Sequence, residues 1–143
     1  MLERTRARRQ ALQMMYQREI TGESVEVILA SGSYSVEDGE PDAFCRQLTL
    51  GAEAHIGAVD ETIGEVSENW SVPRMPLVDR NILRLATYEL LFVDEVPTSV
   101  SINEAVELAK VFGGEDSSKF VNGVLGRIAE KHCEEKGREV SDE

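Results

Sequence analysis

The chain has 143 residues, of which 41% are hydrophobic, and a formal net charge of -12. This length is enough for one globular domain with a buried core. No run of about 18 apolar residues could span a membrane, and the basic start does not lead into the apolar core of a signal peptide, so we expect a cytoplasmic protein.

The first predicted element is a helix over residues 5–20, and its charge differs from that of the whole chain. Residues 1–18 carry five basic side chains and one acidic one. At about 100° per residue, one arc of this helix is apolar; it holds Ala7, Ala11, Leu12, Met14 and Met15. The opposite arc is basic and rich in amides; it holds Arg6, Arg9, Gln10, Gln13 and Gln17. Arg4 and Arg8 lie nearer the apolar arc, and we expect their long stems to carry both guanidinium groups out to solvent.

A basic helix on an acidic chain favours a polyanion as partner, because Lys and Arg that neutralise phosphates release condensed counterions. The alternative is an ordinary solvated helix face. A surface helix in so acidic a protein would usually mix both signs of charge, which weakens that alternative. The rest of the surface would repel a polyanion, so we expect a confined contact at this end.

Shorter elements follow the first helix. We predict a helix over residues 23–31 and then a polar loop over residues 32–39, which we expect to be mobile. Pro41 suits the first turn of a longer helical stretch that continues to Trp70 with a kink near Gly57.

The pair Pro73 and Pro76 ends that stretch and predicts a boundary between two helical subdomains. We place them at about 1–72 and 77–134, followed by a frayed acidic tail over residues 135–143. No segment alternates with period two over more than a few residues. We therefore predict an all-α protein, a compact bundle of about six or seven helices in two packed helical subdomains.

Two further helices are predicted after an amphipathic one over residues 77–96. Ser101-Ile102-Asn103-Glu104 has the pattern of a capping box, which opens a helix over residues 102–112. We expect Gly113-Gly114 to end that helix with a positive φ.

Asp116 and Ser117 are expected to cap the last helix, although its amides and Lys119 could also meet a phosphate. Gly123 interrupts the apolar run of this helix at a cost of about 1 kcal/mol relative to alanine. We expect it to allow close packing against the first helix.

Recognisable catalytic and nucleotide-binding motifs are absent from the sequence. The sequence has no GxGxxG, P-loop, HExxH or GxSxG motif. Cys45 and Cys133 lie far apart, and His55 and His132 are isolated, so we expect two reduced thiols and neither a metal nor a cofactor. Carboxylates are plentiful, but their number alone does not make a site. The sequence therefore predicts a binding protein and not an enzyme.

Three segments resemble the NusB family of bacterial transcription antitermination factors. They are RTRARRQALQMMYQREITG at the start, VDRNILRLATYELLF in the middle and PTSVSINEAVELAKVFGGEDSSKFVNGVLGRI near the end. The resemblance runs from about Arg4 to Ile128 with order and spacing intact. The combination of INEAVELAK and KFVNGVL at this separation is highly specific to the family, whereas the basic start alone is not.

The resemblance implies an all-helical fold and a role in antitermination. Members of the family bind the single-stranded boxA element of ribosomal RNA leaders together with a small-subunit ribosomal protein, called NusE in this role. The complex helps RNA polymerase to resist premature termination.

The resemblance also implies where the partners bind. RNA contacts are expected from the arginine-rich start and the opening of the last helix; the matching residues are Arg4, Arg6 and Arg8, then Asp116, Lys119, Phe120 and Asn122. Arg9 adds charge where many relatives carry an acid, and Gln13 adds an amide on the same face. Asp79 and Glu89 lie in the region expected to face NusE.

Two alternatives stay open. The helical RNA-binding domain that precedes the catalytic part of rRNA cytosine methyltransferases also resembles NusB, but that interpretation requires this chain to be a fragment. The other alternative is a protein-interaction module whose apolar faces form a homodimer of the free protein, with the arginines incidental.

Overall fold

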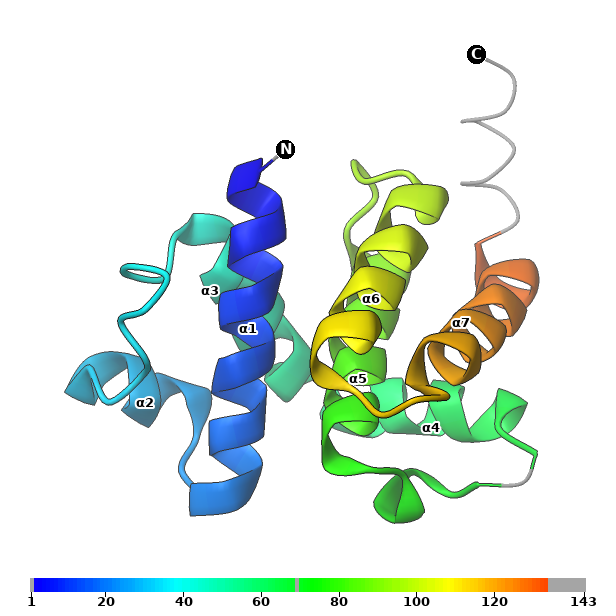
Figure 1. Cartoon of the computed structure of the whole chain (residues 1–143), viewed down its shortest axis with the longest axis horizontal. Coiled ribbons are helices and arrows are strands. Elements are labelled where there is room, and N and C mark those ends of the chain that lie inside the picture. Colours follow the sequence, from blue (N-terminus) through cyan, green and yellow to red (C-terminus); the bar gives the residue numbers. More distant parts are fainter. Residues whose placement is uncertain (1, 69, 134–143) are drawn as a thin grey trace.

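The computed structural model describes residues 2–68 and 70–133, and within them every regular element is helical (Figure 1). The elements are α1 Leu2–Thr21, α2 Val25–Ser31, α3 Ala43–Ala54, α4 Ile56–Val66, the short 3-10 helix η1 Val72–Arg74, α5 Leu77–Phe92, α6 Thr98–Phe112 and α7 Ser117–His132. The prediction of an all-α bundle is confirmed. The predicted tail over residues 135–143 lies outside the described residues.

Helix α5 is the centre of the bundle. It packs against α1, α3, α4, α6 and α7, and each residue from 81 to 90 is buried. Such a helix must bury polar side chains as well as apolar ones, and each needs a partner inside the protein. The boundary between two subdomains stays a prediction, since α5 follows the connector directly and contacts helices on both sides of it.

Helix α1 buries the arc that its sequence predicts. Ala7, Ala11, Leu12, Met14 and Met15 are each at most 3% exposed, and α1 packs against α3 and α5 through them. It ends where expected, because Gly22 takes the left-handed conformation with φ of 77°.

The helices between the first loop and η1 start and stop at other residues than predicted. Pro41 stands before the helix instead of in its first turn: Asp42 is the N-cap, and its carboxylate accepts from the Cys45 amide at 2.9 Å. The predicted kink near Gly57 is a break at His55, with φ of -111° and ψ of 23°.

The capping box at Ser101–Glu104 is not formed. Helix α6 already begins at Thr98 after Pro97, so Ser101 and Glu104 lie within it. Their side chains bind other helices instead, because Ser101 Oγ donates to Glu89 of α5 at 2.9 Å and Glu104 accepts from Thr5 Oγ1 of α1 at 2.8 Å. The polar side chains of the predicted capping box therefore make contacts between helices and do not cap α6.

Two glycine predictions are wrong in their physical reason. Gly113 has φ of -90°, so it needs no left-handed freedom; a Cβ there would lie 2.5 Å from Ser117 Cβ, and close approach is what requires glycine. Helix α7 packs against α6, α5 and α4, and not closely against α1. A Cβ on Gly123 would meet only Arg127 Nη1, at 3.6 Å.

Cys45 lies in the core, and its thiol is expected to be inert in the folded protein. Burial, followed by the charge of Asp42, raises the pKa of Cys45 to about 12. Only the thiolate is nucleophilic, so native protein at about pH 8 should not react with a disulfide reagent, whereas urea-unfolded protein should react fully. The Cys133→Ser variant makes the signal report Cys45 alone. Equal rates from folded and unfolded protein would contradict this assignment.

Candidate nucleic-acid interface

Arg4 and Arg6 are exposed on the first turns of α1. The Arg4 guanidinium lies over the Phe44 ring, 4.2 Å from its centroid, and Arg4 Nη2 is 3.7 Å from Glu95 Oε2. This side chain keeps 44% of its surface exposed. Among the described residues, no carboxylate lies within 4.0 Å of the Arg6 guanidinium. The start of α1 therefore offers two guanidinium groups that an RNA backbone or an unstacked base can reach.

Arg9 and Gln10 fasten the loop between α2 and α3 to α1. Arg9 binds the Asp38 carboxylate with Nε at 2.9 Å and Nη2 at 2.6 Å, and Gln10 Nε2 donates to the carbonyls of Asp38 and Gly39. The hydrogen bond from Arg9 holds the pKa of Asp38 below its ordinary value. Asp38 therefore offsets most of the charge that Arg9 adds. The mobility of this loop stays a prediction.

Arg8 does not reach solvent, and that expectation is wrong. Its residue is 6% exposed, and its guanidinium pairs with Glu89 of α5 and Glu104 of α6. Arg8 lies on the side of α1 that faces these two helices, so a buried ion pair holds it inside.

Asp79 and Glu89, expected to face the ribosomal protein, are also inside the fold. Asp79 is 4% exposed and accepts from Ser117 Oγ of α7 at 2.7 Å, while Glu89 is 2% exposed and paired with Arg8. Neither carboxylate is available to a protein partner in this structure. The family resemblance indicated these positions, but both carboxylates are paired within the bundle.

Asp116 is the N-cap residue of α7, as predicted, but its side chain makes no capping bond. Ser117 Oγ accepts from the amide of Gly114, which precedes the helix, at 2.8 Å. Asp116, Lys119 and Asn122 are exposed. Phe120 is half-buried, and with Trp70 it lines a groove of about 350 Å³. Polar groups and two aromatic side chains are thus close together here.

The two groups of predicted RNA-binding residues lie at opposite ends of α5 and α6 (Figure 1). The opening of α7 is bonded to Asp79, in the first turn of α5, whereas Arg8 is bonded to Glu89. Asp79 and Glu89 are ten positions apart on α5, which corresponds to about 15 Å along the helix axis. An RNA strand that contacts both groups has to span at least this distance. Gln13 follows the arginine-rich start of α1 and is half-buried.

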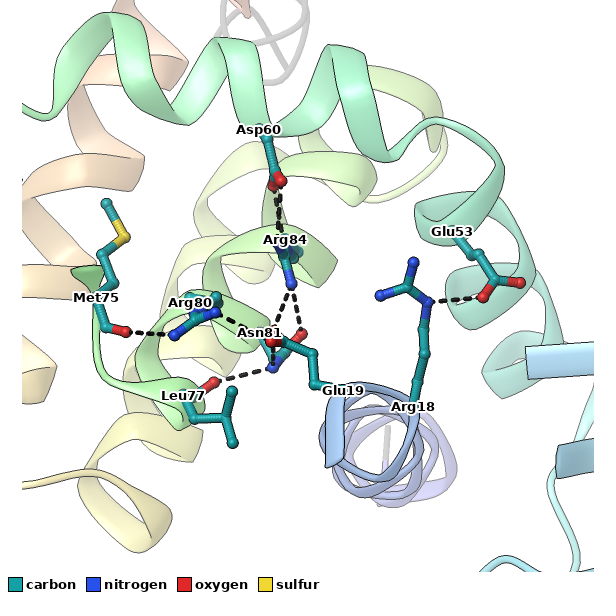
Figure 2. A network of polar contacts seen from close by, with 9 residues as sticks. All are labelled: Arg18, Glu19, Glu53, Asp60, Met75, Leu77, Arg80, Asn81 and Arg84. Atoms are coloured by element: carbon teal, nitrogen blue, oxygen red, sulfur yellow. Dashed lines mark hydrogen bonds and ion pairs between the residues drawn. The ribbon is translucent and has the colours of Figure 1, made fainter. Parts of the chain in front are cut away.

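A second polar cluster, which sequence reasoning missed, holds the other end of α1 (Figure 2). Glu19 accepts from Arg80 Nη1 at 3.0 Å, Asn81 Nδ2 at 3.1 Å and Arg84 Nη1 at 2.6 Å. Arg84 also binds both oxygens of Asp60 on α4, at 2.8 and 2.9 Å. The available signal was the i, i+4 spacing of Arg80 and Arg84 on the amphipathic helix α5. This cluster and the Arg8 pair together hold α1 at both ends.

Comparisons with known proteins give a consistent result. The model of the NusB family matches residues 5–130. Transcription antitermination protein NusB of Desulfitobacterium hafniense (strain DSM 10664 / DCB-2) is 42% identical over 144 residues, which cover 97% of each chain. The protein of the same name from Anaeromyxobacter sp. (strain Fw109-5) is 47% identical over 130 residues, or 90% of each chain.

Solved structures agree with the sequence matches. T. maritima NusB superimposes with a TM-score of 0.82 at 39% identity, over 95% of this chain and 96% of that one. A crystal structure of antitermination factors NusB and NusE in complex with dsRNA matches with a TM-score of 0.74 at 28% identity, over 92% of this chain and 99% of that one. On both its sequence and its fold, the chain belongs to the NusB family.

Proposed function

We propose that this protein is a transcription antitermination factor. It binds boxA RNA of ribosomal leaders together with the ribosomal protein NusE and suppresses premature termination by RNA polymerase. The observation that carries the proposal is the exposed pair Arg4 and Arg6 on a chain of the NusB family with net charge -12. Relatives named transcription antitermination protein NusB and a solved NusB–NusE complex with dsRNA support it. The proposal places the protein in the cytoplasm and gives it no catalytic step.

Each surface of the protein has its own task in this function. Single-stranded RNA is bound through phosphate contacts and through stacking of unpaired bases on aromatic or guanidinium planes. Two exposed arginines supply few phosphate contacts, so the protein alone should bind weakly. A basic ribosomal protein is attracted by the acidic body and adds a second RNA-binding surface, which raises the affinity of the joint complex.

The opening of α7 is the proposed second contact of this protein. Lys119 offers a charge, Phe120 a ring and Asn122 an amide, and Asp116 stands beside them. Because this group lies about 15 Å from the Arg8 anchor along the helix axis, a short RNA should reach one group and a longer RNA both.

Replacing Arg4 and Arg6 with alanine is expected to weaken RNA binding and its dependence on salt. Each phosphate contact on a single strand contributes about 0.7 to the slope of log affinity against log salt concentration. The double variant should therefore lose up to about 1.4 from this slope. Titration of a boxA-containing leader fragment, with and without NusE, at several salt concentrations measures it.

The matched control is the pair Arg74→Ala and Lys131→Ala. Both residues are exposed, on η1 and α7, and the variant loses the same charge at positions outside the proposed RNA contacts. Equal effects of the two double variants would show that Arg4 and Arg6 act only through the net charge of the protein and not through direct RNA contacts. Absence of RNA binding by the unaltered protein, alone and with NusE, would contradict the proposed function itself.

A further inference from the structure

Arg8 makes the densest set of charged contacts among the arginines of α1. Its Nε lies 3.1 Å from Glu89 Oε2, its Nη2 donates to Glu89 Oε1 in a short bond, and its Nη1 lies 3.1 Å from Glu104 Oε1. All three guanidinium nitrogens are therefore engaged inside the protein.

The two carboxylates that hold Arg8 are themselves held. Glu89 also accepts from Ser101 Oγ at 2.9 Å, and Glu104 from Thr5 Oγ1 at 2.8 Å. The Arg8 guanidinium lies 5.2 Å from the centroid of the Phe44 ring. One side chain of α1 thus joins α5, α6 and α3 at a single point.

Arg8 is a fixed cation that RNA cannot withdraw from this position. Burial lowers the pKa of Arg8, but the hydrogen bonds and charges of Glu89 and Glu104 outweigh burial and hold that pKa above its ordinary value. If a phosphate drew Arg8 out to solvent, Glu89 would remain as a carboxylate only 2% exposed, with Ser101 as its donor. An uncompensated buried charge of this kind is strongly unfavourable.

Arg8 also determines where the exposed arginines stand. Arg4 lies one helical turn before Arg8 on the same side of α1, and both guanidinium groups approach the face of Phe44, at 4.2 and 5.2 Å. Arg6 lies between them in sequence and points to solvent. The direction in which α1 presents these side chains follows from how Arg8 docks it.

We propose that Arg8 is a positioning residue for RNA binding, which docks α1 on α5 and α6 and does not itself touch RNA. The inference rests on the proposed RNA-binding function. It differs from the family resemblance, which counts Arg8 among the RNA contacts.

The test compares Arg8→Gln, Glu89→Gln and the double variant that carries both. Arg8→Gln leaves a buried carboxylate without its cation, whereas the double variant keeps the net charge and replaces the ion pair by two amides. Each is titrated with boxA-containing RNA in the presence of NusE over a series of salt concentrations. Arg6→Ala is the reference for a lost RNA contact.

Arg8→Gln should bind about tenfold more weakly with the salt slope of the unaltered protein, and the double variant should recover to within about threefold. Arg6→Ala should instead reduce the slope by about 0.7. Glu89→Gln can rescue a docking role of Arg8, but it cannot replace a lost phosphate contact. Recovery in the double variant is therefore the result that a direct contact does not produce.

A reduced slope in Arg8→Gln, without recovery in the double variant, would overturn the inference and leave the proposed function intact. If Arg8→Gln does not fold, the double variant decides: normal helicity with nearly normal affinity supports positioning, and normal helicity with the loss seen in Arg6→Ala overturns it. If the unaltered protein binds no RNA, the proposed function fails and this inference fails with it.

Discussion

Replacing Arg84 with leucine is expected to lower the free energy of unfolding by about 2 to 3 kcal/mol. The Arg84 side chain is 10% exposed and connects Glu19 of α1 to Asp60 of α4. The change leaves Asp60 without this bidentate partner and removes the closest of the donors to Glu19, while leucine restores no hydrogen bond. The expected loss is below that of a fully buried pair, because 30% of the Asp60 side chain is exposed.

Urea denaturation followed by circular dichroism measures this loss as a lower midpoint at constant m-value. The exposed pair Lys110–Glu107 on α6 is the control, because its side chains are 58% and 65% exposed. Lys110→Ala should cost less than about 0.5 kcal/mol. If both variants lowered the free energy of unfolding by similar amounts, the cluster around Glu19 would contribute no more to stability than an exposed ion pair.

Replacing Gly51 with alanine is expected to cost about 2 kcal/mol of stability. A Cβ on Gly51 would overlap the Cζ, hydroxyl and Cε1 atoms of the Tyr88 ring, with Cε1 at 2.7 Å. The ring cannot easily move, because it stacks on Phe92 at 5.1 Å between centroids. Overpacking of this severity costs about 3 kcal/mol, and the better helix propensity of alanine returns about 1 kcal/mol.

Gly64 provides the matched control for Gly51. It lies within α4, and a Cβ there would have no heavy atom within 4 Å apart from its neighbours and the helix's own backbone. Gly64→Ala should therefore stabilise the protein by up to about 1 kcal/mol. Thermal unfolding of both variants would show shifts of opposite sign, and a gain in stability from Gly51→Ala would refute the close approach of α3 and α5.

Helical periodicity predicted the elements well because it depends on residues close in sequence. The predicted apolar arc of α1 is buried, because a helix with one buried face has apolar residues at a spacing of three and four. Helix ends were less predictable. Asp42 and Pro41 both suit a helix start, and Ser101–Glu104 matches a capping box although Pro97 starts that helix earlier.

The site was harder to predict, because charge does not reveal exposure. Arg8 and Glu89 are 81 positions apart, and no spacing rule pairs them before the helices are packed. The long stem of Arg8 suggested that its guanidinium reaches solvent, and the family resemblance suggested that Glu89 faces a partner. Arg4 and Arg6 were correctly expected to be exposed, and for Arg6 the reason is that it lies on the predicted polar arc of α1.

The central place of α5 has a consequence for how the protein is made. Helix α1 leaves the ribosome before Glu89 and Glu104, which dock it, because these residues lie 81 and 96 positions after Arg8. Until then Arg8 lacks both Glu89 and Glu104 as partners, and the apolar arc of α1 cannot pack against α5. A nascent or truncated chain that ends before α6 would carry every arginine of the start and still lack the docked helix. The start of the chain therefore becomes a docked helix only after both α5 and α6 have been synthesised.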